Sequence, residues 1–257
     1  MIRFLTESER KKKLMSSYQT FAEFYDRLTE NVDYKVRSEY ISNFFSRYGK
    51  NEKTVLDLAC GTGSISKYLS EKSYSVIGID LSDEMLTQAI NKEINNAFFV
   101  KADISDFRLP ERVNYCVCSL DSINHLSSIT DVENCFKCVY ECLNTGGVFV
   151  FDVNTLYKHE NILSNNTFVF DEEDFFLSWD NEYLGEGTVR ILLDFFIFNG
   201  NNYDRYSEEF CEKAYTLDSI ICILEKIGFS IIGVYNDLTE NPSEEDSERV
   251  YFVVRKI

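Results

Sequence analysis

The chain has 257 residues, of which 44% are hydrophobic and 15% aromatic, so it can bury a full-sized core in one main domain with an insertion. Its 43 acidic and 26 basic side chains give a net charge of −17, which disfavours nucleic acid as a partner because phosphate binding needs clustered Lys and Arg. Residues 1–16 lack the apolar core of a signal peptide, and no stretch approaches the roughly 20 apolar residues of a membrane span, so we expect a cytoplasmic protein with no membrane partner.

The first 50 residues are expected to form helices that cap the main domain. Aromatic and aliphatic side chains recur at helical spacing over residues 17–28 and again over residues 40–48. The basic run at residues 10–13 is expected to be a solvated helix face. Tyr25 and Tyr34 are either core tyrosines or contacts to a bound cofactor or a lid.

From residue 51 onward, strand-like and helical segments alternate. Short apolar runs predict strands at residues 54–58, 74–79, 97–100, 115–120, 148–153, 231–235 and 250–254. Periodic segments between them predict helices at residues 65–70, 83–90, 130–143 and 216–227. This alternation is typical of a parallel sheet with helices on both faces. We therefore predict an α/β domain made of residues 51–159 and 214–257.

The pattern changes between residues 160 and 213, where aromatic side chains are mixed with acidic ones. The pair Asn199-Gly200 between two strand-like runs is a hairpin signal. We expect a small antiparallel β-sheet inserted into the main domain at residues 160–213. Its aromatic residues, including Trp179, are expected to form the core of this sheet; contact with a substrate is the alternative.

A glycine-rich turn follows the first predicted strand. The chain passes from a buried strand containing Asp57 through Ala59, Gly61 and Gly63 into a helix. Glycines at such a place permit a tight turn and let a ligand approach the backbone closely. A purely structural turn is the alternative for this motif taken alone.

Two carboxylates follow at positions that suit a nucleoside. Asp80 ends the next strand, 19 residues after Gly61 (80 − 61 = 19), where it can accept hydrogen bonds from both ribose hydroxyls. Asp103 follows the third strand, where it can accept a hydrogen bond from an adenine amino group. Ser66 stands where the dinucleotide fingerprint prefers Gly or Ala, so the turn favours a nucleoside without pyrophosphate over NAD.

These spaced motifs resemble those of class I S-adenosylmethionine-dependent methyltransferases, and the resemblance covers nearly the whole chain. It implies a Rossmann-like, seven-stranded α/β sheet with an antiparallel final strand, and S-adenosylmethionine as the cofactor. It also implies that Asp80 holds the ribose, that Leu81 and Met85 sandwich the adenine, and that Asp103 with the amide of Ile104 reads the adenine edge. The full set of residues implied to contact the cofactor is Tyr25, Tyr34, Asp57, Ala59, Gly61, Gly63, Asp80, Leu81, Met85, Ala102, Asp103, Ile104 and Leu120.

The acceptor is expected beyond the fourth strand, at the carboxyl edge of the sheet. Residues 119–126 resemble the corresponding segment of bacterial aminosugar N-methyltransferases, in which a His can stand beside the acceptor. His125 is therefore the candidate catalytic residue, as a group that orients the acceptor or as its base; a helix-start histidine bonded to the backbone is the alternative. His159 is expected at the surface.

The cysteines Cys135, Cys138 and Cys142 form a string that could suggest a metal site. They border or lie near the apolar face of a predicted amphipathic helix, where a small hydrophobic side chain needs no metal to explain it. In a reducing compartment we expect the thiols to be free and the site to hold no metal.

The favoured hypothesis is an enzyme that moves the methyl group onto a nitrogen or oxygen of a small-molecule acceptor by in-line displacement. Alignment of the acceptor is the main task of such an enzyme, and a general base is needed only where the acceptor must lose a proton. The alternatives are a protein or RNA methyltransferase, a non-catalytic S-adenosylmethionine-binding protein and an NAD-dependent dehydrogenase. No motif specifies the oligomeric state.

Overall fold

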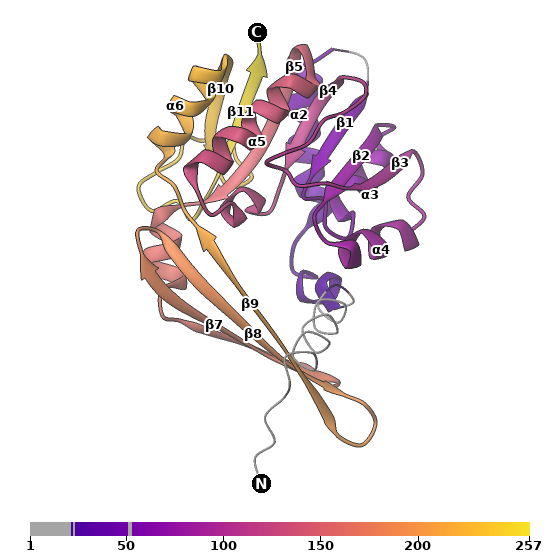
Figure 1. Cartoon of the computed structure of the whole chain (residues 1–257), viewed down its shortest axis with the longest axis vertical. Helices are drawn as coiled ribbons and strands as arrows, with labels where there is room; N and C mark the ends of the chain where they lie inside the picture. Colours follow the sequence, from indigo (N-terminus) through magenta and orange to yellow (C-terminus); the bar gives the residue numbers. More distant parts are fainter. Residues whose placement is uncertain (1–21, 23, 51–52) are drawn as a thin grey trace.

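The structure is a computed structural model that describes residues 22, 24–50 and 53–257. The basic run at residues 10–13 and the start of the first predicted helix lie outside these residues. Figure 1 shows an α/β layer structure with a second, antiparallel sheet at one end of it.

A seven-stranded sheet forms the centre of the molecule, in the order β10-β11-β5-β4-β1-β2-β3. Its strands are β1 (Thr54–Leu58), β2 (Ser75–Asp80), β3 (Ala97–Lys101), β4 (Val113–Cys118), β5 (Leu143–Asn154), β10 (Phe229–Asn236) and β11 (Arg249–Lys256). Strand β11 runs antiparallel to both of its neighbours, whereas β1 to β5 are parallel. The predicted Rossmann-like sheet with an antiparallel final strand is therefore confirmed.

Helices cover both faces of this sheet because each carries one apolar stripe. They are α2 (Tyr34–Tyr48), α3 (Ser64–Glu71), α4 (Asp83–Asn91), α5 (Ile129–Cys142) and α6 (Leu217–Ile227), with a 3₁₀ turn η1 (Ser122–His125) and a π-helical turn η2 (Lys158–Leu163). Buried side chains of α2 and α3 pack on one face, and those of α5 and α6 pack on the other. Side-chain caps begin four of the helices, at Asp33, Ser82, Ser128 and Thr216.

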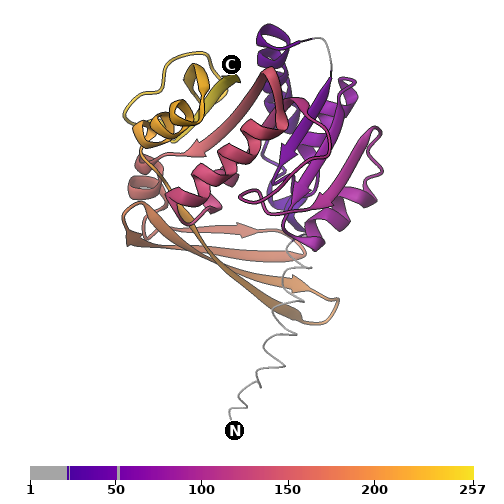
Figure 2. The ribbon, with the colours of Figure 1, turned by 45° about the horizontal axis from the view of Figure 1, so that its top comes forward.

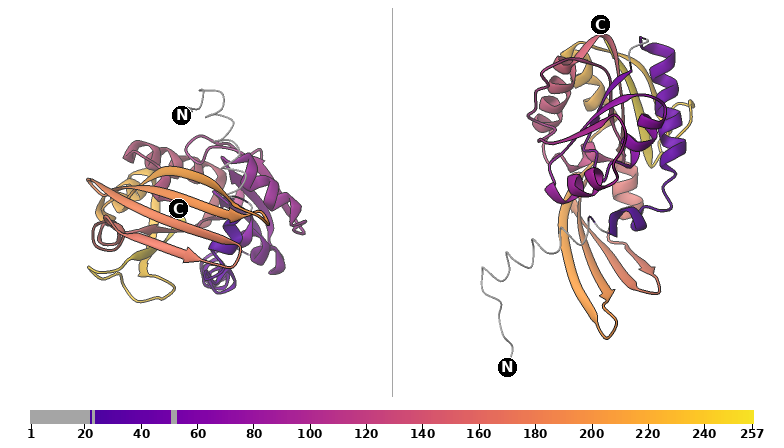
Figure 3. Two further views of the ribbon diagram at one scale, coloured as in Figure 1. Left: turned by 90° about the horizontal axis from the view of Figure 1, so that it is seen from below. Right: turned by 90° about the vertical axis from the view of Figure 1, so that its right-hand side faces the viewer.

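A four-stranded antiparallel sheet lies across the carboxyl ends of the parallel strands (Figures 2 and 3), and we name it the roof sheet. It consists of β6 (Thr167–Asp171), β7 (Phe175–Gly185), β8 (Thr188–Phe198) and β9 (Tyr203–Lys213). The predicted Asn199-Gly200 turn joins β8 to β9. Phe175 and Phe195 are buried in its own core, and Trp179 packs against that core. Phe24 and Leu28, which belong to the helical segment at residues 24–28, also pack there and join this segment to the roof sheet.

Strand β5 is longer than predicted. It begins at Leu143, directly after α5, so the Gly146-Gly147 pair lies within the strand. Gly146 has a positive φ of 82°, and the register between β4 and β5 shifts near this point. The strand therefore continues through the two glycines with a local backbone irregularity.

The cysteine string lies on α5, as predicted. Cys135 and Cys142 are buried against the sheet and Cys138 is half-buried, and all eight cysteines of the chain are free. Across residues 22, 24–50 and 53–257, no group of three or more His, Cys, Asp or Glu side chains is arranged to hold a metal ion. No helix of the same residues is long and apolar enough to cross a membrane.

Candidate functional site

The glycine-rich turn between β1 and α3 contains three residues with positive φ: Ala59 at 50°, Gly61 at 54° and Gly63 at 77°. A Cβ atom added to Gly61 would meet no atom within 4 Å. One added to Gly63 would lie 3.1 Å from the Phe99 ring and 3.2 Å from the Cβ of Ala89. Gly61 therefore borders open space that a ligand can enter, whereas Gly63 permits close packing of α3.

Asp80 connects the end of β2 to this turn. Its Oδ2 accepts a hydrogen bond from the Gly61 N–H at 2.8 Å, and its Oδ1 accepts one from the Ser82 N–H at 2.9 Å. A carboxylate oxygen can accept more than one hydrogen bond, so both oxygens keep acceptor capacity for a ligand.

Asp57 is buried beneath the turn, and its hydrogen bond with Ser66 accounts for a serine at that position. The Ser66 Oγ donates a hydrogen bond to Asp57 Oδ2 at 2.5 Å. Burial is the main cause that raises the pKa of Asp57 to about 7, and the field of Asp80 adds to it. Ser66 thus supplies a hydrogen bond where a dinucleotide-binding turn would have a residue without a polar side chain.

The residues expected to hold adenine lie beside Asp80, at the carboxyl ends of β2 and β3. Leu81 is 63% exposed although it is a large aliphatic side chain, and Met85 is half-buried. The Ala102 N–H donates to the Asp80 carbonyl at 3.0 Å, which brings the start of the Asp103 loop next to Asp80. Asp103 itself is exposed, and its Oδ1 accepts from the N–H and Oγ of Ser105, at 2.8 and 2.7 Å.

Tyr25 lies among the carboxylates that follow β2 and β4. Burial of its hydroxyl raises its pKa well above the ordinary value, and the fields of Tyr34, Asp121 and Asp80 act in the same direction. Tyr25 is also hydrogen-bonded to Tyr34, whose hydroxyl donates to Thr29 Oγ1 at 2.9 Å. Tyr25 therefore lies close to the carboxylates of the site, whereas Tyr34 also packs against the hydrophobic cluster that contains Ile41 and Phe45.

Asp26 connects the helical segment at residues 24–28 to the glycine-rich turn. Its Oδ1 accepts from Thr62 Oγ1 at 2.5 Å, and its Oδ2 lies 2.6 Å from Lys92 Nζ. A cavity of about 660 Å³ borders this contact and is lined partly by Tyr34 and Ser64, but by neither Asp80 nor Asp103. The cavity is therefore separate from the two carboxylates expected to hold the nucleoside.

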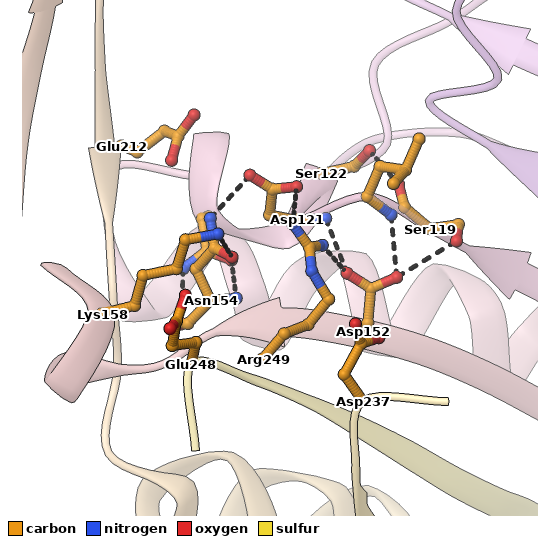
Figure 4. A network of polar contacts seen from close by, with 12 residues as sticks. Ser119, Asp121, Ser122, Asp152, Asn154, Lys158, Glu212, Asp237, Glu248 and Arg249 are labelled. Atoms are coloured by element: carbon orange, nitrogen blue, oxygen red, sulfur yellow. Dashed lines mark hydrogen bonds and ion pairs between the residues drawn. The ribbon is translucent and has the colours of Figure 1, made fainter. Parts of the chain in front are cut away.

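A buried polar network supports the opposite side of the site, after β4 (Figure 4). Asp152 is fully buried in β5, and it accepts from the N–H groups of Leu120 and Asp121, both at 2.8 Å, and from Ser119 Oγ at 3.1 Å. Leu120 and Asp121 have positive φ values of 58° and 53°. Two consecutive non-glycine residues in this region are costly, so Asp152 holds a strained turn in place.

Arg249, at the start of β11, joins the two acids of this network. Its guanidinium donates to Asp121 Oδ1 at 2.8 Å and also to Asp152 Oδ1. Asn154 Nδ2 donates to the other oxygen of Asp121 at 2.7 Å. Burial acts to raise the pKa of Asp121, but the opposing fields of Arg249 and Lys158 lower it to about 2, so this carboxylate is ionised.

His125 lies at the end of η1, directly beneath the roof sheet. Its side chain is 50% exposed, its Nε2 is 3.8 Å from Glu212 Oε1, and its ring centroid is 5.4 Å from that of Phe210. Asn124 Nδ2 donates to the carbonyls of Asn154 and Lys213, at 3.1 and 3.0 Å. Asn124 thereby fastens the end of β9 to β5, which positions Glu212 beside His125.

Glu212 is a buried acid at the centre of this region. Burial and the field of Asp121 raise its pKa to about 7, against the opposing effects of His125, Lys158 and Arg249. The prediction that His159 lies at the surface is wrong, because η2 packs against β7 and β8 and buries this ring completely. His159 Nδ1 lies 2.8 Å from the Gly187 carbonyl, and its Nε2 is 3.8 Å from Glu212 Oε2.

The sequence analysis did not identify Asp152, Arg249 or Glu212, although each leaves a signal. Asp152 interrupts an apolar strand, and Arg249 begins another. Along β9, side chains alternate between the two faces, so Glu212 shares a face with Phe210. An acid on the apolar face of a strand is the pattern that could have indicated a site.

The chain is similar in sequence and in fold to known proteins. The family model described as a methyltransferase domain matches residues 55–147, which include the glycine-rich turn, Asp80, Asp103 and His125. The chain is 32% identical over 244 residues to YqeM of Bacillus subtilis (strain 168), provisionally named a methyltransferase, covering 93% of this chain and 97% of the relative.

A solved structure resembles most of the chain and has the same level of sequence identity. It is a crystal structure of an S-adenosylmethionine-dependent methyltransferase from Clostridium acetobutylicum ATCC 824, with a TM-score of 0.85 and 32% identity over 93% of this chain and 98% of the other. A third relative is the dTDP-3-amino-3,4,6-trideoxy-alpha-D-glucopyranose N,N-dimethyltransferase of Streptomyces venezuelae. It is 28% identical over 133 residues, which cover 51% of this chain and 56% of that protein.

Proposed function

Since the chain belongs to the S-adenosylmethionine-dependent methyltransferases, we propose that it methylates a nitrogen atom of a small-molecule acceptor beneath the roof sheet. The family, the fold and the cofactor predicted from the motifs are confirmed by the similarity to relatives and solved structures. The acceptor and the roles of individual side chains belong to the proposal. An oxygen acceptor is the alternative within the same reaction class.

The residues around the glycine-rich turn suit this cofactor. Asp80 would accept hydrogen bonds from the ribose hydroxyls, and the exposed Asp103 would accept one from the adenine amino group. Leu81 and Met85 offer apolar surface to the base, and the open space above Gly61 gives room for the rest of the molecule. When bound, S-adenosylmethionine supplies an electrophilic methyl group on a positively charged sulfur.

The two glycines of the turn are expected to respond differently to substitution. Gly61→Ala should weaken binding of S-adenosylhomocysteine at least about tenfold, because its methyl group would enter the open space. Gly63→Ala should lower the free energy of unfolding by about 1–3 kcal/mol more than Gly61→Ala, because both variants share the strain of a positive φ but only the methyl group at residue 63 would crowd Phe99 and Ala89. Calorimetric titration and urea denaturation of both variants test this; the reverse assignment of effects would contradict it.

The observation that carries the acceptor assignment is the pair of His125 and the buried Glu212 at the carboxyl edge of the sheet. An aliphatic amine is mostly protonated at neutral pH and must lose a proton before its lone pair can form a new bond. A base with a pKa near the working pH is suited to this task. Half-exposed His125 would contact the amine and pass its proton toward Glu212.

This pair leads to a prediction about turnover. His125→Ala should lower kcat at least about a hundredfold while leaving the affinity for S-adenosylhomocysteine unchanged. In the parent enzyme kcat should rise as the pH increases through about 7, where Glu212 loses its proton. Glu212→Gln should abolish that step in the pH profile of kcat, and a profile unchanged by this substitution would exclude Glu212 as the base.

The proposed function itself is tested by release of S-adenosylhomocysteine from S-adenosylmethionine in the presence of amines, matched alcohols, polypeptides or RNA, each supplied separately. We expect release with amines. Release only with polypeptides or RNA would contradict a small-molecule acceptor, and no release with any acceptor would favour a non-catalytic binding protein.

A further inference from the structure

One face of strand β9 is turned toward the site. Because side chains alternate along a strand, Glu208, Phe210 and Glu212 share a face. Phe210 and Glu212 both approach His125, so this face points at the carboxyl edge of the central sheet. Glu208 points to the same side, one step further along the roof sheet.

Glu208 is a buried acid with one unsatisfied carboxylate oxygen. Only 6% of its surface is exposed, and its Oε1 accepts no hydrogen bond. Burial raises its pKa to about 8, and the charge that adds to this effect belongs to Glu84 in the first turn of α4. Its neighbour Glu209, on the opposite face, is exposed and lies 3.7 Å from Arg190, so β9 offers an ordinary surface acid for comparison.

Buried acids are normally paired with bases, because an unpaired charge away from water is costly. At the other end of the same face, Glu212 has His125, Lys158 and Arg249 nearby. Among the residues that the structure describes, the charge that acts on Glu208 is that of a second carboxyl group, Glu84, and no basic side chain offsets it. A positively charged ligand would satisfy Glu208 and would also offset the charge of Glu84, whose Oε2 accepts one hydrogen bond, from Ser82 Oγ at 3.0 Å.

We propose that Glu208 and Glu84 form an ammonium-binding subsite, and that the acceptor is a small molecule with two basic nitrogens. This inference rests on the proposed function, in which the nitrogen that is methylated lies at His125 and Glu212. Cα atoms four residues apart on a strand are separated by about 13 Å, so the second nitrogen lies well away from the first along β9.

The α-ammonium group of the cofactor has the same chemistry and is the other possible source. Glu84 lies in the first turn of α4, between Leu81 and Met85 in sequence, which is the part of the site assigned to the adenine. The methionine end is assigned to the open space above Gly61, whose N–H donates to Asp80 Oδ2, whereas the N–H of Ser82, two residues before Glu84, donates to Asp80 Oδ1. The acceptor is therefore the better source of the ammonium group.

Calorimetry with a matched pair of probes tests the subsite. Protein saturated with S-adenosylhomocysteine is titrated with octane-1,8-diamine and with octylamine, which differ only in the second ammonium group. We expect the parent to bind the diamine at least about tenfold more tightly than the monoamine, as one added charge-assisted hydrogen bond would produce. Glu208→Gln should reduce this ratio to within about twofold, whereas Glu209→Gln should preserve it.

Other results would count against the subsite or against the proposed function. Equal affinity of the parent for the two probes, or a ratio that survives in Glu208→Gln, overturns the subsite. A loss of S-adenosylhomocysteine affinity in Glu208→Gln with an unchanged ratio assigns the ammonium group to the cofactor and also overturns it. The titration needs no turnover, so a Glu208-dependent ratio without product from any amine would reject the proposed function and leave the subsite standing.

Discussion

The variant Asp80→Ala is expected to bind S-adenosylhomocysteine at least about a hundredfold more weakly than the parent, because two effects add. The first is loss of the proposed hydrogen bonds to the ribose, each worth about 1.5–3 kcal/mol when the acceptor is charged. The second is loss of the hydrogen bonds to the N–H groups of Gly61 and Ser82, which hold the turn and the start of α4.

Isothermal titration calorimetry measures this effect. Asp83→Asn is the matched control, since Asp83 is an exposed acid only three residues away that pairs with Lys101. It should bind the ligand like the parent. Unchanged affinity in Asp80→Ala would refute the assignment of Asp80 to the ribose.

Arg249→Met is expected to lower the free energy of unfolding by about 3–5 kcal/mol, the usual cost of breaking a buried ion pair from one side. The substitution leaves Asp121 and Asp152 in a buried site without their common partner. Their repulsion would also release the strained turn at Leu120 and Asp121, so turnover should fall sharply. Arg255→Met on the same strand is exposed and should change stability by less than about 0.5 kcal/mol.

Urea denaturation at several pH values shows whether the loss of stability in Arg249→Met grows or shrinks with pH. In the parent, the pKa of Asp121 is lowered, so its contribution to stability is present above the pKa of the unfolded state and is lost as the pH falls toward about 2. In Arg249→Met the unpaired acids would bind protons more readily. The stability difference between parent and variant should therefore shrink as the pH is lowered from 7 toward 4, and a constant difference would contradict this account.

The central sheet could be predicted from sequence because its signals are local. Each predicted strand is an apolar run that ends in a turn or a helix cap, and β1 with Gly61 forms one continuous motif. The positions of Asp80 and Asp103 could also be predicted from sequence. Asp80 ends β2 and Asp103 follows the end of β3, and because these strands are parallel both residues lie at the same edge of the sheet.

The polar network could not be predicted in this way because its contacts are distant in sequence. Arg249 reaches Asp121 across 128 positions and Asp152 across 97. The register of β5 with β11 decides that these side chains meet, and no local pattern encodes that register. The wrong placement of His159 has the same cause, since its burial depends on how η2 packs against the roof sheet.

The roof sheet could be predicted from sequence only in part. Its hairpin was predicted from Asn199-Gly200, and its aromatic core from composition. Its placement over the carboxyl edge depends on contacts such as that of Asn124 with Lys213. The roles proposed for Glu208 and Glu212 follow from this placement and not from their own sequence neighbourhood.

The central claim is that the nucleoside lies against Asp80 and Asp103 and directs its sulfur toward His125 beneath the roof sheet. A crystal structure of the protein with S-adenosylhomocysteine tests it most directly. We predict ribose hydroxyls within hydrogen-bonding distance of Asp80 and the adenine amino group within reach of Asp103. A nucleoside bound elsewhere, or a sulfur that faces away from His125, would contradict the account.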